Sequence, residues 1–263
     1  MIYVEERGNG KPLLLIHGFG VDHRILASLS QMLDELGGWK QIFIDLPGHG
    51  HSPIGDVSSS QDVVDAVESW IHTHIAEESF AVIGNSFGGM VARCIAHDMR
   101  EQVFGLATLA GVFVNDHDKR SLPPKTVLHS DPELISSLGE NGEDYAQMAV
   151  VQTAKHAAAF ESYVQPGLEV ADRDALHRIS SQYSLEQEPE DAHPEAFTQP
   201  SLFITGKQDQ IVGYQDAWNR LEHYPRASFA VLDAAGHNVH LERQLLVEAL
   251  IRDWLNRIDD NNA

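Results

Sequence analysis

Ser86 is the residue with the clearest chemical meaning, because it lies between Gly84 and Gly88 in the pattern G-x-S-x-G. The apolar run 80–83 before it is typical of a buried strand, and residues 89–96 resemble the start of a helix. A sharp strand-to-helix turn strains the serine backbone, and flanking glycines let the strand and helix pack closely. Because such a turn exposes the hydroxyl group, we predict that Ser86 is a nucleophile.

An acid and a base for this serine follow later in the chain. Asp209 comes shortly after the strand-like run 201–205, and His237 comes shortly after the run 228–232. Open parallel sheets place their sites beyond the carboxyl ends of strands, so we expect both side chains beside Ser86. Together, a serine, a histidine and a carboxylate activate a hydroxyl group for attack on an acyl carbon.

Two neighbours of His237 offer competing interpretations. Asp233 is an alternative acid, but it lies only four residues before His237 and is too close to reach around the same loop. His240 could form one half of a metal-binding pair, but no matching set of carboxylates or histidines accompanies it. We therefore expect Asp209 to be the acid and no metal to be bound.

The motifs around these residues resemble those of the α/β-hydrolase superfamily. G-N-S-F-G-G at 84–89, G-K-Q-D at 206–209 and A-G-H-N at 235–238 stand where the family has its nucleophile, acid and base. The likeness covers nearly the whole chain. It implies an α/β fold with a mostly parallel central sheet flanked by helices, and a helical cap inserted between strands 6 and 7. It implies no cofactor.

The same resemblance implies an oxyanion hole made of two backbone N–H groups. One belongs to Phe87, directly after the nucleophile, and the best match for the other is Phe19 in the loop H-G-F-G at 17–20. Fixed N–H donors aimed at the developing oxyanion are often the largest catalytic contribution. We interpret His17 as a brace for the loop that carries Phe19.

The order of patterns along the chain divides it into a core and an insertion. Residues 1–111 alternate strand and helix patterns, residues 112–198 contain helical patterns only, and residues 199–263 return to the sheet. We expect the first and last segments to form the hydrolase core and the middle one to form a cap, or lid, over Ser86. There is little room for an extra strand before Ile2. The further predicted strands lie at residues 2–6, 13–16, 41–46 and 103–109. The predicted helices include those at 24–36 and 143–164.

Five residues are candidates for lining the substrate pocket. Tyr145 and Met148 lie on one face of the predicted helix 143–164. A plain packing stripe is the alternative interpretation of that face. The other candidates are Phe19, Asn85 and Asn238.

The formal net charge of −21 limits the possible partners. Nucleic acids and anionic membranes both require a cationic face, so neither is expected. The longest apolar runs fall short of the ~20 residues of a membrane span, and charges near the N-terminus do not suit an export signal. We expect a cytoplasmic protein that acts on a small-molecule acyl substrate. The sequence does not indicate an oligomeric state.

We expect a serine hydrolase, with a small carboxylic ester as substrate and an acyl-enzyme as intermediate. Other proteins of this fold leave alternative functions open. G-N-S-x-G-G is similar to carbon–carbon bond hydrolases, although those carry Trp where this chain has Asn238, and thioester hydrolases use the same machinery. H-G-F-G-V-D-H-R at 17–24 is also similar to slow-turnover receptors or signalling proteins on this fold. A serine nucleophile disfavours the dehalogenase and epoxide-hydrolase branches, which use aspartate.

Overall fold

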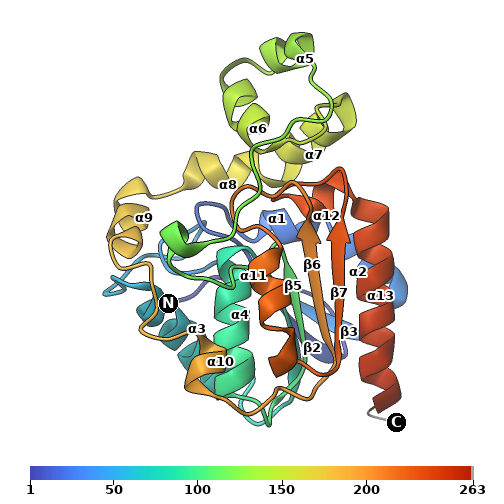
Figure 1. Ribbon diagram of the computed structural model, residues 1–263. Coiled ribbons are helices and arrows are strands. Elements are labelled where there is room, and N and C mark those ends of the chain that lie inside the picture. Colours follow the sequence, from blue (N-terminus) through green and yellow to red (C-terminus); the bar gives the residue numbers. More distant parts are fainter. Residues whose placement is uncertain (262–263) are drawn as a thin grey trace.

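The computed structural model describes residues 1–261 and contains a seven-stranded sheet (Figure 1). Its strand order is β1-β3-β2-β4-β5-β6-β7, and only the β1–β3 pair is antiparallel. The predicted mostly parallel sheet is therefore confirmed. The strands are β1 (Val4–Gly8), β2 (Lys11–Ile16), β3 (Trp39–Ile44), β4 (Phe80–Asn85), β5 (Val103–Leu109), β6 (Ser201–Gly206) and β7 (Ala227–Leu232).

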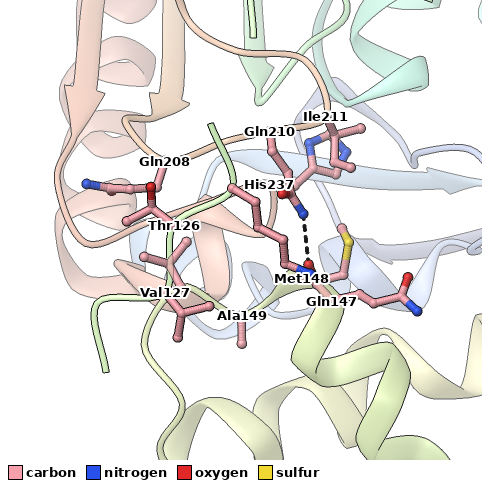
Figure 2. A pocket seen from close by; sticks show the side chains of 11 residues that line it. Thr126, Val127, Gln147, Met148, Ala149, Gln208, Gln210, Ile211 and His237 are labelled. Atoms are coloured by element: carbon pink, nitrogen blue, oxygen red, sulfur yellow. Dashed lines mark hydrogen bonds between the residues drawn. The ribbon is translucent and has the colours of Figure 1, made fainter. Parts of the chain in front are cut away.

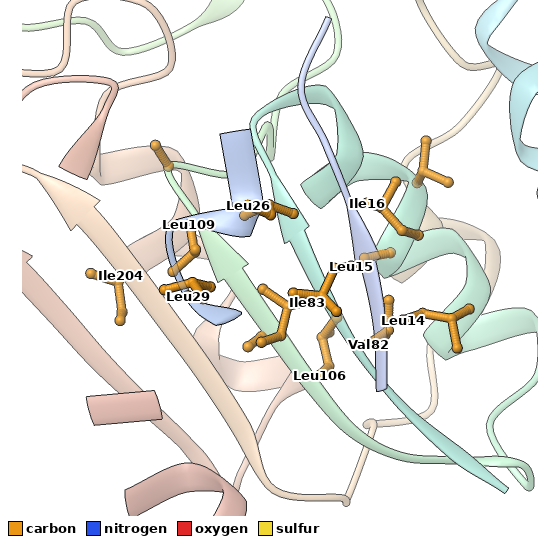
Figure 3. Packing of buried hydrophobic residues seen from close by; sticks show 14 of the residues in the cluster. Leu14, Leu15, Ile16, Leu26, Leu29, Val82, Ile83, Leu106, Leu109 and Ile204 are labelled. Carbon is orange, nitrogen blue, oxygen red and sulfur yellow. The ribbon is translucent and has the colours of Figure 1, made fainter. Parts of the chain in front are cut away.

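The central strands are buried on both faces, as continuous apolar runs predict. Side chains of β2, β4, β5 and β6 interdigitate with those of the first helices (Figure 3). Leu14, Leu15, Val82 and Ile83 have no exposed surface. This rigid core fixes the carboxyl ends of the strands, where the candidate site residues lie.

Helices cover both faces of the sheet (Figure 1). On one face lie α3 (Ser60–His74), α4 (Phe87–Asp98) and α11 (Gln215–Asn219), and on the other lie α2 (Ser30–Leu36) and α13 (Gln244–Asn261). The short helices α1 (Arg24–Ala27) and α12 (Val239–Glu242) lie near the strand ends. None of the helices within residues 1–261 is long and apolar enough to cross a membrane.

A helical insertion connects β5 and β6 (Figure 1). No strand precedes β1 within the described residues, so this connection follows the fifth strand present rather than a sixth. The expected boundaries at residues 111/112 and 198/199 lie close to the ends of these two strands, and the division into separate domains stays a prediction. The helices of the insertion are η1 (His117–Lys119), α5 (Pro132–Ser137), η2 (Gly139–Asn141), α6 (Gly142–Met148), α7 (Ala154–Tyr163), α8 (Gln165–Val170), α9 (Arg173–Ser180) and α10 (Pro189–Ala192).

Two predicted helices are each broken into two. The helix predicted at 24–36 is interrupted between α1 and α2, and the helix predicted at 143–164 is interrupted between α6 and α7. At the second break, Val151 forms an isolated bridge with His129, and the Thr153 side chain caps α7 by accepting from the His156 N–H. The prediction of one long helix at 143–164 is therefore wrong, because long-range partners take the backbone groups that the helix would have used.

Candidate active site

Ser86 is the single residue between β4 and α4, and its backbone is strained. Its φ of 51° and ψ of −117° lie outside the regions that non-glycine residues usually adopt. The surrounding backbone holds this conformation, since the Ser86 N–H donates to the carbonyl of Leu109 at 3.0 Å and its carbonyl accepts from Val112 N–H at 3.0 Å. The strand-to-helix turn that the sequence predicts is confirmed.

The flanking glycines permit this turn by close packing. A Cβ at Gly84 would lie 2.2 Å from the carbonyl oxygen of Gly88. A Cβ at Gly88 would lie 2.3 Å from the carbonyl oxygens of both Ile16 and His17. Any side chain at either position would push the helix away from the sheet, so the predicted need for glycine here is confirmed.

The structure brings Asp209 and His237 together beside Ser86. His237 Nε2 lies 2.8 Å from Ser86 Oγ, and its Nδ1 lies 3.0 Å from Asp209 Oδ2. An ionised carboxylate only accepts hydrogen bonds, so Nδ1 carries the proton and Nε2 accepts from the serine hydroxyl group. The buried Asp209 is itself held by the N–H groups of Ile211 and Val212, which donate to Oδ1 at 2.8 and 3.1 Å.

The two competing residues are engaged elsewhere. Asp233 is exposed, and its Oδ1 accepts from Gln208 Nε2 at 2.8 Å. His240 is fully buried with Nε2 3.2 Å from the carbonyl of Ile25, and burial lowers its pKa to about 4. Within residues 1–261, neither side chain is hydrogen-bonded to His237.

The two backbone N–H groups of the expected oxyanion hole lie on adjoining segments. The N–H of Phe87 is the first of α4, and helix starts leave such groups without an intrahelical acceptor. Phe19 lies in the loop after β2, and its ring contacts that of Phe87 edge-on at 5.4 Å between centroids. The loop approaches Ser86 closely, since a Cβ on Gly18 would lie 3.1 Å from the serine Cβ. The role of these N–H groups stays a prediction.

His17 braces this loop as interpreted from the sequence. Its Nε2 accepts the N–H of Leu46 at 2.9 Å, so its Nδ1 carries the proton and donates to the carbonyl of Gly18 at 2.7 Å. Burial lowers the pKa of His17 and keeps the ring neutral. The ring thereby ties the loop after β2 to the loop after β3.

Two cavities meet at Ser86 and His237. The first has a volume of about 250 Å³ and includes four of the five predicted pocket residues, Phe19, Asn85, Met148 and Asn238. Phe19 and Met148 line both cavities. The wall of the first is mainly apolar and comes from both core and insertion: Val21, Ile25, Phe160, Val164 and Leu168.

The second cavity has a volume of about 850 Å³ and opens more widely than the first. Apolar atoms make up most of its exposed lining, but the polar share is larger than in the first cavity, and the polar side chains include Asn115, Arg120 and Gln182. A much smaller pocket lies on another side of His237, where Gln210 Nε2 donates to the carbonyl of Gln147 at 3.0 Å (Figure 2). That hydrogen bond links the end of α6 to the loop that carries Asp209.

Tyr145 does not line either large cavity. Its ring packs against Phe160 at 5.6 Å, and its hydroxyl group bonds with the backbone of Thr153. It supports the wall from behind, because the end of α6 turns Met148 and Gln147 toward the cavity instead. For Tyr145, the packing interpretation describes the structure better than the pocket interpretation.

Glu242 contributes to the site although no sequence pattern indicated it. Its Oε2 accepts from the N–H of Gly236, next to His237, at 2.6 Å, and its Oε1 accepts from the N–H of Val150 in the insertion at 2.9 Å. Burial raises its pKa, while these N–H donors oppose the shift. One carboxylate therefore fixes the loop of His237 against the insertion.

A second cluster, Asp22, His23 and Asp45, places three possible metal ligands within 4.8 Å of one another. Its polar groups are already paired, since His23 Nδ1 lies 2.8 Å from Asp45 Oδ1 and Asp22 binds Arg24. Burial favours a higher pKa for Asp45, but hydrogen bonds from the His23 side chain and the His51 N–H lower this pKa to about 2. The cluster shapes the turn after β3 without needing an ion.

The sequence model of the alpha/beta hydrolase fold family matches residues 11–244 of this chain. The chain belongs to this family. The α/β hydrolase is 28% identical to a pimeloyl-[acyl-carrier protein] methyl ester esterase of Shewanella woodyi, over 97% of this chain and 98% of that protein. It is 26% identical to the esterase YbfF of Escherichia coli, over 96% of each chain.

Solved structures support the same fold. An alpha/beta superfamily hydrolase from Oenococcus oeni superimposes with a TM-score of 0.92 at 24% identity, over 98% of this chain and 96% of that one. A thermophilic esterase from Thermogutta terrifontis superimposes with a TM-score of 0.73 at 22% identity, over 98% and 93%.

Proposed function

We propose that this α/β hydrolase cleaves a small carboxylic ester through an acyl-enzyme formed on Ser86. The observation that carries the proposal is the hydrogen-bonded chain from Ser86 Oγ through His237 to Asp209, at the place where two cavities meet. The esterase names of the two sequence relatives support an ester as the bond cleaved.

The first half of the reaction acylates the serine. His237 Nε2 takes the proton of Ser86 Oγ as the oxygen attacks the acyl carbon, and Asp209 stabilises the imidazolium that forms. The N–H groups of Phe19 and Phe87 stabilise the oxyanion. His237 then gives its proton to the alkoxide oxygen, and the alcohol leaves.

The second half regenerates the enzyme. His237 removes a proton from water, which attacks the acyl carbon, and the carboxylic acid leaves as Ser86 Oγ recovers its proton. Residues 112–198 act as a cap in this proposal, because their side chains Phe160, Val164 and Leu168 form an apolar wall around the bound acyl chain. Excluding water from this wall strengthens the electrostatic contributions at the serine.

The first prediction tests the nucleophile. Ser86→Ala and His237→Ala each lower kcat for p-nitrophenyl butyrate by at least about 10⁴-fold, because each removes a member of one catalytic unit. Steady-state release of p-nitrophenol gives kcat, and circular dichroism verifies the fold. Ser162→Ala is the matched control, since this exposed serine bonds only within α7.

Two outcomes contradict the proposal. Wild-type-like turnover by Ser86→Ala excludes the nucleophile. A single turnover by the unmodified protein, with no further product, indicates a binding protein rather than an enzyme.

A further inference from the structure

The two cavities at Ser86 differ in chemistry. The smaller one is mainly apolar but holds one carboxylate, Asp144. The larger one also has apolar walls, with Met148, Tyr183 and Ile211 in its lining, but its polar share is larger. We call it the polar groove because it contains serine, asparagine and glutamine side chains and one guanidinium group, that of Arg120. Among the described residues lining the two cavities, Arg120 is the only arginine or lysine. The two arms of the site therefore favour different parts of a substrate.

The guanidinium group of Arg120 is held in a fixed orientation. Its Nε donates to the carbonyl of Val114 at 2.9 Å and its Nη1 to the carbonyl of Ile211 at 3.1 Å. It also lies 5.8 Å from the centre of the Tyr183 ring. Two of its five N–H donors are used by these backbone contacts, so others remain for a ligand. Anchoring by carbonyls orients the group without neutralising its charge.

The charge of Arg120 is not balanced by an ion pair within residues 1–261. Arg24 pairs with Asp22 and Arg220 with Asp191, whereas Arg100 and Arg178 resemble Arg120 in bonding to backbone carbonyls. What distinguishes Arg120 from these two is its position in the lining of the cavity of Ser86. An arginine presents a fork of donors that matches a carboxylate, and such charge-assisted bonds are strong.

We propose that Arg120 binds a carboxylate carried by the alcohol part of the ester, so that the substrates are acyl esters of hydroxycarboxylic acids. This rests on the proposed function. The acyl chain occupies the apolar cavity, where Asp144 repels a second carboxylate. The alcohol occupies the polar groove, whose open form lets the first product leave while the acyl group is still bound to Ser86.

The reaction that follows is balanced by water alone. The bond between the acyl carbon and the alkoxide oxygen breaks. The hydroxyl group of water joins the acyl carbon, and its proton joins the alkoxide oxygen. The products are a carboxylic acid and a hydroxycarboxylic acid, and Arg120 takes no part in the bond changes.

The test compares two esters that differ only in charge, 3-butyryloxybenzoate and 3-butyryloxybenzamide. Arg120→Gln lowers kcat/KM for the benzoate about 10- to 100-fold, mainly through KM, and changes the benzamide little. The benzamide is the internal control for a loss of structure, together with the melting temperature. Lys119→Gln is the matched control. It removes one positive charge from an exposed neighbouring residue that does not line the groove.

Other results overturn the proposal. If Arg120→Gln lowers kcat/KM equally for both esters, the arginine has a structural role only. If monophenyl glutarate, which carries its carboxylate on the acyl side, depends on Arg120 instead, the assignment of the groove is wrong.

Binding separates this proposal from the reaction itself. Calorimetry with 3-hydroxybenzoate on Ser86→Ala, with and without Arg120→Gln, needs no turnover. If no ester is hydrolysed but 3-hydroxybenzoate binds in a way that depends on Arg120, the proposed function is overturned and the carboxylate site is retained. Hydrolysis without such binding retains the proposed function and overturns the carboxylate site.

Discussion

At the scale of single residues, Asp209 is restrained on both of its oxygens. Oδ1 is fixed by two backbone N–H groups and Oδ2 faces His237 Nδ1. The carboxylate therefore cannot turn away from the imidazole, and it selects the tautomer whose Nε2 accepts from Ser86. Asp233 belongs to the same sheet edge but binds Gln208, so it cannot replace Asp209 in this role.

The second prediction follows from this restraint. Asp209→Asn lowers kcat by about 10⁴-fold, because an amide group donating toward Nδ1 stabilises the wrong tautomer. The asparagine oxygen still accepts from the backbone, so the melting temperature changes little. Asp233→Asn is the control and retains full activity; comparable losses in the two variants contradict the assignment of Asp209.

At the scale of elements, one arginine joins both ends of the insertion to the helix that begins after Ser86. Arg93 of α4 is fully buried, donates to the carbonyl of Val112 at 2.6 Å and forms an ion pair with Glu190. Glu188 accepts from the N–H of Asn115 at 2.7 Å and also pairs with Arg93. The first and last turns of the insertion are thus fixed to one point of the core.

The third prediction concerns this buried network. Arg93→Met lowers the free energy of unfolding by about 3–5 kcal/mol, because it leaves the carboxylate of Glu190 buried without its partner. Urea unfolding at pH 7 measures the change. Arg220→Met is the control. It removes a partly exposed ion pair with Asp191, which lies on α10 as Glu190 does, and costs at most about 1 kcal/mol. Equal losses in both variants contradict the role given to Arg93.

The elements also show why parts of the structure were predictable and others were not. The motif around Ser86 and the strands that end near Asp209 and His237 depend on local patterns, and their placement could be predicted. The break between α1 and α2 could not, because the carbonyl of Ile25 finds a donor in His240, 215 residues away. Apolar periodicity indicates which side of a segment is buried, and a break in the backbone leaves that side unchanged.

Site residues that act through distant backbone groups were missed for the same reason. Glu242 accepts hydrogen bonds from the N–H groups of Gly236 and Val150, and no residue spacing in the sequence predicts these contacts. The position of Arg120 in the cavity of Ser86 likewise depends on the fold, and no local pattern in the sequence predicts it. Tyr145 shows the opposite error, since a helical stripe cannot distinguish a cavity wall from the layer behind it.

At the scale of the whole molecule, buried histidines make the fold sensitive to acid. Burial lowers the pKa of His49 to about 3 and those of His97 and His240 to about 4. In the unfolded chain these groups titrate near the ordinary histidine value of about 6.5. Glu68 acts in the opposite direction, because burial and Asp98 raise its pKa to about 7. Glu242 and His23, whose pKa values are also raised, act in the same direction as Glu68. His17, whose pKa burial lowers, adds to the three histidines, so the histidines with lowered pKa values prevail.

The fourth prediction is a loss of stability as the pH falls from 7 to 5. Between pH 6.5 and 4 the unfolded chain binds protons at histidines that remain neutral in the folded protein, so protonation favours unfolding. Each of the three contributes a loss of about 1–2 kcal/mol by pH 5, which urea unfolding at the two pH values measures. His240→Gln reduces this dependence on pH, and His72→Gln, at an exposed position, is the matched control. A stability that is constant or rises toward pH 5 shows that the buried histidines do not control the response to acid.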